Sequence, residues 1–272
     1  DCQFGGYFSQ NEHLSFWFPK LQDTIQKMFP LKYQKDSSTG FYAALKKQVR
    51  ISGKFNAIGD ADTVLLHKEL YKILALIQSD THSYYRFWNQ TIKCLIVNYR
   101  ISNLKAFNSG MRDSMMYENF EVQKNDHQGS KIIIWAATDH SSFRSVDLPS
   151  DYSINKSMGT YLKEKYSSKY YAISFSSYEG KIGTSDLLQY TLKKSTAQSF
   201  EGEMQKLSDS IDIFVNFRNT ANKEYFDKRI SSSRLLYSEE IAVKPWWVVD
   251  GAYYFKTMKR PKHLRGRYKY HY

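Results

Sequence analysis

The residues best suited to chemistry follow one apolar run. Lys131–Ala136 reads KIIIWA, and the loop after Trp135 places Asp139 and His140 side by side. An imidazole titrates near neutral pH, so His140 is a candidate to take a proton from a water molecule. A structural histidine held by hydrogen bonds explains the same residue, and the position in a loop leaves both interpretations open.

A second set of candidates shares one face of an expected helix. Arg112, Met116 and Asn119 follow the spacing i, i+4, i+7. The guanidinium of Arg112 could hold a carboxylate or an oxyanion through two parallel hydrogen bonds. The alternative is a surface arginine paired with Glu118 or Asp113, which is a common and weak arrangement.

Other chemistries lack their residue patterns. The sequence contains no G-x-S-x-G turn for a serine nucleophile, no phosphate-binding G-x-x-x-x-G-K-[ST] loop, and no His or Cys pair at metal-binding spacing. Cys2 and Cys94 are too few for a disulfide scaffold or a four-cysteine zinc site. We therefore expect neither a metal nor a cofactor.

The elements that must position these residues change in type along the chain. Apolar spacing and capping residues predict helices over 16–29, 41–51, 62–78, 82–103 and 109–122, and later over 158–166 and from 203 onwards. Short apolar runs predict strands over 131–136, 169–175, 211–217 and 246–249.

The order of these elements predicts an α/β fold. Strand, helix and strand between residues 131 and 175 form a βαβ unit, which implies parallel pairing. We expect a mostly parallel sheet flanked by helices, with a helical layer formed by residues 16–122. Ligands gather beyond the carboxyl ends of such strands, and His140 follows the strand expected over 131–136.

Composition indicates a globular chain with a basic end. Of the 272 residues, 42% are hydrophobic and 24% are charged, which excludes a disordered chain. No apolar run is long enough to span a membrane, and residues 1–20 do not resemble a signal peptide. The net charge is +12, but the segment 256–272 alone holds seven Lys or Arg and no acid. We expect a basic tail there and no nucleic-acid binding, although an anion-binding role of the tail stays open.

Several segments together resemble the erythromycin esterase family. The stretch 135–140 is similar to the family's W-A-H-N-A-H motif, and 112–119 is similar to its R-[DE]-x-x-M-x-x-N helix. The further similar segments follow in the family's order: Ser157–Leu162, Tyr171–Phe175, Gly180, Phe200-Glu201, Arg218, Asp250-Gly251 and Phe255.

Two departures from the family pattern affect the expected chemistry. Ala137 stands where the family has the first histidine of its motif, and the N-terminal G-E-x-x-H-G motif is absent. The histidine of that motif is thought to activate the attacking water. The resemblance therefore implies that residues 1–255 are one α/β domain, incomplete at its N-terminus, with the catalytic base upstream of Asp1.

The resemblance implies metal-independent hydrolysis of a macrolactone or related ester, as in a bacterial response to an antibiotic. Arg112 would bind the developing oxyanion and His140 would orient water or substrate. The substrate would also contact Asn119, Met116, Asp139 and Trp135. The alternative is a non-catalytic relative that binds an ester, a sugar or a protein partner. The oligomeric state stays open, as does the compartment, where we favour the cytoplasm; any signal segment would precede Asp1.

Overall fold

The computed structural model describes residues 18–29, 40–45, 60–77, 83–103, 109–143, 156–185, 188–208, 212–236 and 238–259. The chain divides into two compact units, Asp1–Ile133 and Ile134–Tyr272. Each unit has its own hydrophobic core. Within the described ranges, no helix is long and apolar enough to cross a membrane.

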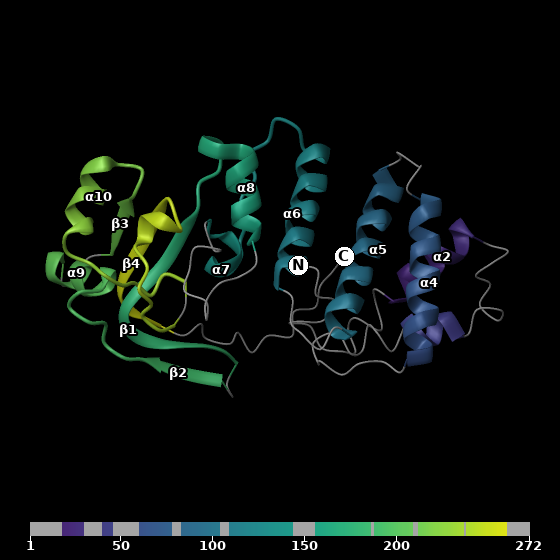
Figure 1. Cartoon of the computed structure of the whole chain (residues 1–272), viewed down its shortest axis with the longest axis horizontal. Helices are drawn as coiled ribbons and strands as arrows, with labels where there is room; N and C mark the ends of the chain where they lie inside the picture. The colour runs from purple at the N-terminus through teal and green to yellow at the C-terminus, as the bar shows by residue number, and fades with distance from the viewer. Residues whose placement is uncertain are drawn as a thin grey trace. The chain divides into compact units, whose positions relative to one another are not determined.

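The first unit is helical (Figure 1). It contains α2 (Phe18–Met28), a helical turn over 40–45, α4 (Asp60–Ile77), α5 (Ser83–Asn103) and α6 (Ser109–Asp126). Its core joins fully buried side chains of α4, such as Leu66 and Leu70, to those of α5, such as Leu95. These helices confirm the helices predicted between residues 16 and 122 wherever the chain is described; residues 46–51 of one of them lie outside the described ranges.

The second unit is built around a four-stranded sheet in the order β2-β1-β4-β3. Its strands are β1 (Ile173–Ser185), β2 (Leu188–Leu192), β3 (Ile213–Asn216) and β4 (Gly251–Met258). Its helices are α7 (Thr138–Ser141), α8 (Met158–Tyr166), α9 (Phe200–Leu207) and α10 (Thr220–Asp227), with 3-10 turns at Ser167–Lys169 and Pro245–Trp247. The second unit is therefore mixed α/β.

The prediction of a mostly parallel sheet is wrong. Only β1 and β4 pair in parallel among the described strands, whereas β1 with β2 and β3 with β4 are antiparallel. The antiparallel pairing of β1 with β2 follows from the length of their connection, because Ser185 pairs with Leu188 and only two residues lie between them. Such a short connection can join only antiparallel strands.

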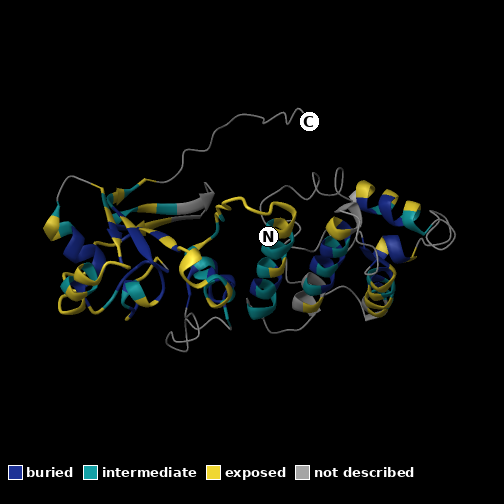
Figure 2. Cartoon of the chain, turned by 90° about the horizontal axis from the view of Figure 1, so that it is seen from above, coloured by how far each residue is buried: buried dark blue, intermediate teal, exposed yellow. Residues whose placement is uncertain are grey.

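The strand predicted over 131–136 is also wrong. This segment has no regular secondary structure, and no backbone hydrogen bond joins it to a described strand. Ile133 is 91% exposed and Trp135 is 85% exposed, and Figure 2 shows most of the stretch after α6 as exposed. A run of β-branched residues fits a strand by composition alone, whereas a strand also needs a partner edge for its backbone.

Of the other predictions in the second unit, one strand and one helix are confirmed and one strand is wrong. β3 confirms the strand predicted over 211–217, and α8 confirms the helix over 158–166, whose cap Ser157 accepts the N–H of Thr160 at 3.2 Å. The strand predicted over 246–249 is wrong: Pro245 starts a 3-10 turn there, and β4 begins only at Gly251. A proline suits the first position of a helical turn because it has no N–H to donate.

One substitution pair tests the exposure of the KIIIWA segment. We expect Ile133→Ala to lower the free energy of unfolding by less than about 0.5 kcal/mol, as at other exposed positions. Leu162→Ala in α8, where the leucine is 0% exposed, should lower it by about 2–5 kcal/mol. Urea unfolding followed by circular dichroism measures both. A loss for Ile133→Ala as large as that for Leu162→Ala would show that the segment is a buried strand after all.

Candidate active site

The predicted catalytic histidine lies on the short helix α7. His140 is buried, with 9% of the residue exposed. Oδ1 of Asp139 accepts the backbone N–H of His140 at 3.0 Å, and Oδ2 of Asp139 lies 4.0 Å from Nε2 of the imidazole. The second distance is too long for a hydrogen bond. It is short enough that a protonated His140 would be attracted by the carboxylate.

The amino end of α7 is attached to β1 through Ser174. The side chain of Ser174 is fully buried, and its hydroxyl lies 3.1 Å from Oγ1 of Thr138 and 2.8 Å from the carbonyl of Leu235. A serine hydroxyl carries one proton, and the carbonyl can only accept. Ser174 therefore donates to Leu235 and accepts from Thr138.

The carboxyl end of α7 is held by three further hydrogen bonds. They join Tyr170 Oη to the Ser141 carbonyl, Ser157 Oγ to the Ser142 carbonyl at 2.6 Å, and the Phe143 N–H to the Val248 carbonyl at 2.9 Å. Gly159 of α8 lies against the same carbonyls, because a Cβ there would come within 2.2 Å of the Ser141 oxygen. A turn held from both ends keeps the His140 backbone in one place.

The position of this turn differs from the expected one. Ser174 is the second residue of β1, and Val248 precedes β4, so α7 contacts the amino end of the parallel pair. The expectation placed it beyond the carboxyl ends. The reason is that residues 131–136 do not enter the sheet as a parallel strand, and so cannot deliver α7 to its carboxyl edge.

The other predicted site residues lie in two places. Arg112, Met116 and Asn119 are on α6 in the first unit, where Met116 packs against the cluster of Cys94 and Met115, and Asn119 lies 3.5 Å from the Cys94 sulfur. These contacts attach α6 to α5. That Arg112 and His140 line one cavity stays a prediction.

Trp135, the remaining predicted residue, lies in the second unit. Its exposed ring lies 5.7 Å from that of Phe175 on the face of β1. Phe175 in turn stacks on Tyr253 of β4 at 5.6 Å. Trp135 thus ends a row of rings on one face of the sheet and leaves most of its apolar surface exposed.

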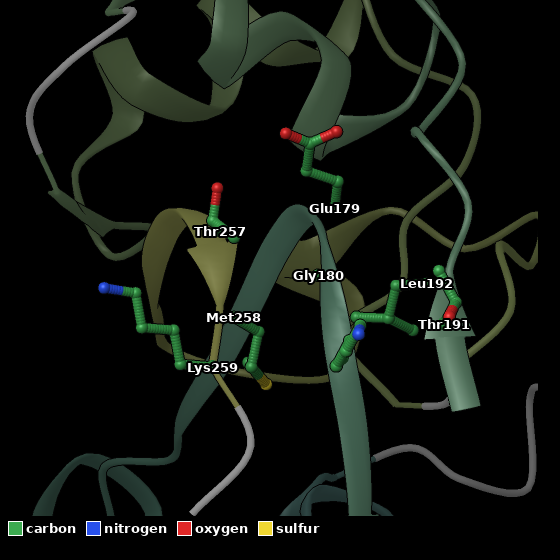
Figure 3. Close-up of a pocket in the computed structure, with 8 residues that line it drawn as sticks. Glu179, Gly180, Thr191, Leu192, Thr257, Met258 and Lys259 are labelled. Carbon is green, nitrogen blue, oxygen red and sulfur yellow. The ribbon is translucent and has the colours of Figure 1, made fainter. Parts of the chain in front are cut away.

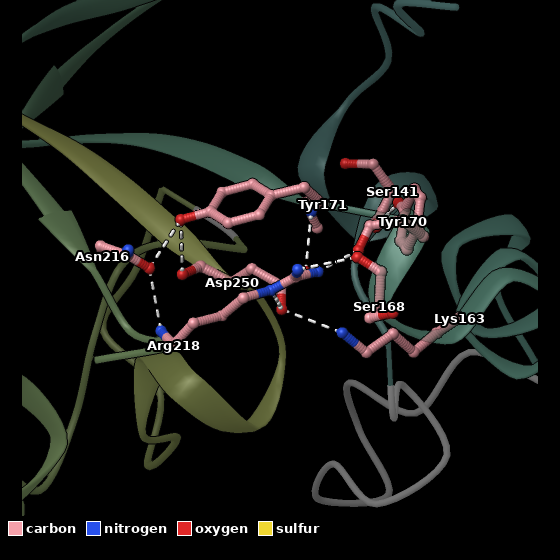
Figure 4. A network of polar contacts seen from close by, with 9 residues as sticks. Ser141, Lys163, Ser168, Tyr170, Tyr171, Asn216, Arg218 and Asp250 are labelled. Atoms are coloured by element: carbon pink, nitrogen blue, oxygen red, sulfur yellow. Dashed lines mark hydrogen bonds and ion pairs between the residues drawn. The ribbon is translucent and has the colours of Figure 1, made fainter. Parts of the chain in front are cut away.

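A network around Asp250 was not predicted as a site (Figure 4). The Asp250 carboxylate accepts hydrogen bonds from Nε of Arg218 at 2.8 Å, from Nζ of Lys163 at 2.9 Å and from the N–H of Ala172 at 3.0 Å. Arg218 also donates to the carbonyls of Ser168 and Tyr170. The network joins α8, the start of β1, the residues after β3 and the start of β4.

The electrostatics of the Asp250 network favour its ionised form. Burial by itself would raise the pKa of Asp250, but the hydrogen bonds from Arg218, Ala172 and Lys163 outweigh it and hold the pKa below its ordinary value. The burial of the Tyr170 hydroxyl, together with the negative charge of Asp250, raises the pKa of Tyr170. Tyr170 therefore stays a neutral donor to α7.

A second buried carboxyl, Glu201 of α9, lies among polar side-chain atoms that have no hydrogen-bond partner within the described ranges. We call Ser195, Glu201, Ser233 and Arg234 the Glu201 cluster; the unpartnered atoms are Oγ of Ser195, Oε2 of Glu201, Oγ of Ser233 and Nε of Arg234. Each such atom costs about 1–3 kcal/mol. Four of them would approach the total stability of a typical domain, about 5–15 kcal/mol.

A pocket of about 490 Å³ opens at the carboxyl end of the parallel pair (Figure 3). Its lining includes Glu179, Lys181, Leu192, Met258 and Lys259 and contains none of the predicted site residues. Within the described ranges, the pocket included, no group of three or more His, Cys, Asp or Glu side chains is placed to hold a metal ion.

Comparison with known proteins assigns this mixed α/β fold to a family. A model of the erythromycin esterase family matches residues 41–239, which is well over half of the chain. The chain belongs to the erythromycin esterase family. The matched range includes the helix of Arg112 and the turn of His140. A search of curated proteins finds no match.

Solved structures share the fold at low sequence identity. A succinoglycan biosynthesis protein matches with a TM-score of 0.67 and 12% identity over 89% of this chain and 61% of its own. A protein from Bacillus cereus matches with 0.64 and 14% over 89% and 63%. A mutant of the erythromycin esterase EreC in its open conformation matches with 0.61 and 12% over 87% and 64%. The chain thus spans less than two thirds of the length of these structures.

The Asp250 network gives the second prediction. The pKa of Asp250 is lower in the folded than in the unfolded protein, so its ionised form stabilises the fold above about pH 4. This stabilisation is lost as the pH falls below about 4, through the folded-state pKa. We expect Asp250→Asn to lower the free energy of unfolding at pH 7 by on the order of 3 kcal/mol and to flatten the fall of that free energy as the pH drops below about 4.

Asp227→Asn is the matched control, because Asp227 is half-exposed and pairs only with Lys244 among the described residues. Such a surface pair contributes about 0–1 kcal/mol. Urea unfolding at several pH values compares the two variants. Equal losses for both at pH 7 would mean that the Asp250 network does not hold the unit together.

Proposed function

We propose that this chain is part of a carboxylic ester hydrolase in which His140 orients the attacking water or the substrate. One observation carries the proposal: a buried imidazole lies on a turn held at both ends by hydrogen bonds, with the Asp139 carboxylate 4.0 Å from its Nε2. Enzymes gain rate by holding reacting groups in place before the reaction, and a fixed turn supplies that order. Family membership supports the same reaction class.

The reaction needs a base, a group that orients the water or the substrate, and a group that stabilises the oxyanion. A histidine base takes a proton from water, the hydroxide adds to the ester carbonyl, and the electron pair of the C=O bond moves to its oxygen. The guanidinium of Arg112 is our candidate to stabilise that oxyanion. Collapse of the intermediate expels the alcohol oxygen, which takes the proton back from the base. No metal is required in this sequence of steps.

The base in this proposal comes from outside the 272 residues. The family's G-E-x-x-H-G motif, which carries the histidine thought to activate water, does not occur in the sequence. His140 then serves as the second histidine of the site. Removal of a general base costs on the order of 100- to 10,000-fold in rate, so we expect the chain by itself to be a poor catalyst.

The proposed substrate is a macrolactone or a related ester. Trp135 offers an exposed ring beside Phe175, which suits the apolar body of such a molecule. Asp139 lies on the turn that carries His140 and would contact the substrate from there, whereas Met116 and Asn119 would contact it from α6. We place no cofactor in the site.

The second candidate function is a non-catalytic relative that binds an ester, a sugar or a protein partner. Ala137 favours it, because the family's first motif histidine is missing at that position. This candidate predicts binding without turnover, even when a base is supplied.

Chemical rescue separates the two functions. Imidazole added to the solution can replace a missing histidine base, so we expect erythromycin A to be hydrolysed faster by the chain as the imidazole concentration rises. Hydrolysis is followed by mass spectrometry as the addition of one water to the macrolide. We expect His140→Asn to reduce the rescued rate by on the order of 100-fold or more.

His127→Asn is the control, because His127 is an exposed residue in the turn after α6. It should leave the rescued rate unchanged. Saturable binding of erythromycin A with no imidazole-dependent hydrolysis would favour the non-catalytic relative. Equal rescue in wild type and His140→Asn would remove His140 from the mechanism.

A further inference from the structure

The Glu201 cluster lies in the core of the second unit and takes no part in the proposed reaction. Each of its residues is at least nine-tenths buried, and one side-chain atom of each has no hydrogen-bond partner among the residues that the structure describes. Ser177 also has an unpartnered hydroxyl, but alternation along β1 places its side chain on the opposite face from Ser176, which binds Glu201. Ser177 is therefore not part of the cluster.

A hydrogen bond, a shared acceptor and a chain neighbour link the members of the cluster. The backbone N–H of Arg234 donates to Oε1 of Glu201 at 2.9 Å. The carbonyl of Tyr178 accepts both Nη1 of Arg234 at 3.3 Å and the N–H of Ser195 at 3.1 Å. Ser233 directly precedes Arg234 in the chain. The unpartnered atoms thus belong to residues that are bonded to each other, adjacent in the chain, or bonded to the same carbonyl.

The chemistry of these atoms indicates what could satisfy them. The guanidinium nitrogen can only donate, the serine hydroxyls can donate and accept, and the carboxyl oxygen accepts when Glu201 is ionised and can donate when Glu201 is protonated. A ligand that serves all of them in both protonation states of Glu201 must itself both donate and accept. Water does so, and buried waters typically make about three hydrogen bonds to such groups.

The charges around the cluster argue against an ion. Nη2 of Arg234 lies 3.9 Å from Oε1 of Glu240, which offsets its positive charge. Burial raises the pKa of Glu201, although hydrogen bonds from Ser176 and Arg234 oppose the shift. A carboxyl that takes up a proton more readily is closer to neutral, so neither a cation nor an anion would find an uncompensated charge here.

We propose that the Glu201 cluster is an internal hydration site, in which ordered water bridges Oε2 of Glu201 and Nε of Arg234 and contacts the neighbouring serine hydroxyls. This water ties α9 to the loop of residues 232–236. The same loop presents the Leu235 carbonyl to Ser174, which in turn accepts from Thr138 of α7. The hydration site therefore adjoins the loop to which Ser174 attaches the His140 turn. The proposal does not depend on the proposed esterase activity.

Serine-to-alanine substitutions test the proposal because its two alternatives predict opposite signs. A hydroxyl bonded to water stabilises the fold, whereas a buried hydroxyl without a partner destabilises it. We expect Ser233→Ala and Ser195→Ala to speed amide hydrogen exchange in β1 and α9 by about 5- to 30-fold, as a loss of one or two hydrogen bonds does. Hydrogen exchange read by mass spectrometry on the full chain gives the rates.

Ser231→Ala is the control, because Ser231 is exposed and should leave these rates unchanged. Unchanged or slower exchange in both cluster variants would overturn the proposal. A crystal structure of the same chain supplies a readout that does not depend on the variants. We expect density for water within about 2.7–3.2 Å of Oε2 of Glu201 and Nε of Arg234. Direct contact between the two side chains, or a halide or metal ion at that place, would overturn it.

Discussion

The attachment of α7 to β1 is the interaction on which the candidate site depends. One buried hydroxyl, that of Ser174, accepts from Thr138 and donates to Leu235, so the turn that carries His140 is joined both to the sheet and to the loop behind it. A helix of four residues has too few internal hydrogen bonds to be stable by itself. Its conformation is therefore set by the sheet, by α8 and by the residues before β4.

The Asp250 network acts on the same turn. Tyr170 donates its hydroxyl to Ser141 and accepts from Arg218 at its carbonyl, while the ammonium of Lys163 lies over the ring of Phe143 at 4.5 Å. Asp250 holds both cations. The amino end of the parallel strand pair thus has a continuous set of charged and hydrogen-bonded groups between the sheet and α7. This arrangement brings together Arg218 and Asp250, which are 32 residues apart in the sequence.

Local signals predicted the helices, whereas the sheet depended on contacts that the sequence does not encode locally. The periodicity of α4 and α5 and the cap at Ser157 are properties of neighbouring residues, and the structure confirms them. The KIIIWA run has the composition of a strand, but pairing is decided by whether a partner edge is present. Pro245 turned an expected strand into a 3-10 turn.

The site was predictable in part for the same reason. A loop histidine beside an acid marked His140, but the side chains that hold its turn come from far along the chain. Thr138 and Ser174 are 36 residues apart, and Lys163 and Asp250 are 87 residues apart. No spacing rule marks such partners, and only the resemblance had singled out Asp250 and Arg218, without a role.

The central claim is that the guanidinium of Arg112 and the imidazole of His140 serve one ligand. Nitrogen-15 NMR of these two side chains during a titration with erythromycin A tests it most directly. The account predicts that both signals shift and that both saturate at the same ligand concentration. A shift of only one signal, saturation at clearly different concentrations, or no shift of either would contradict it.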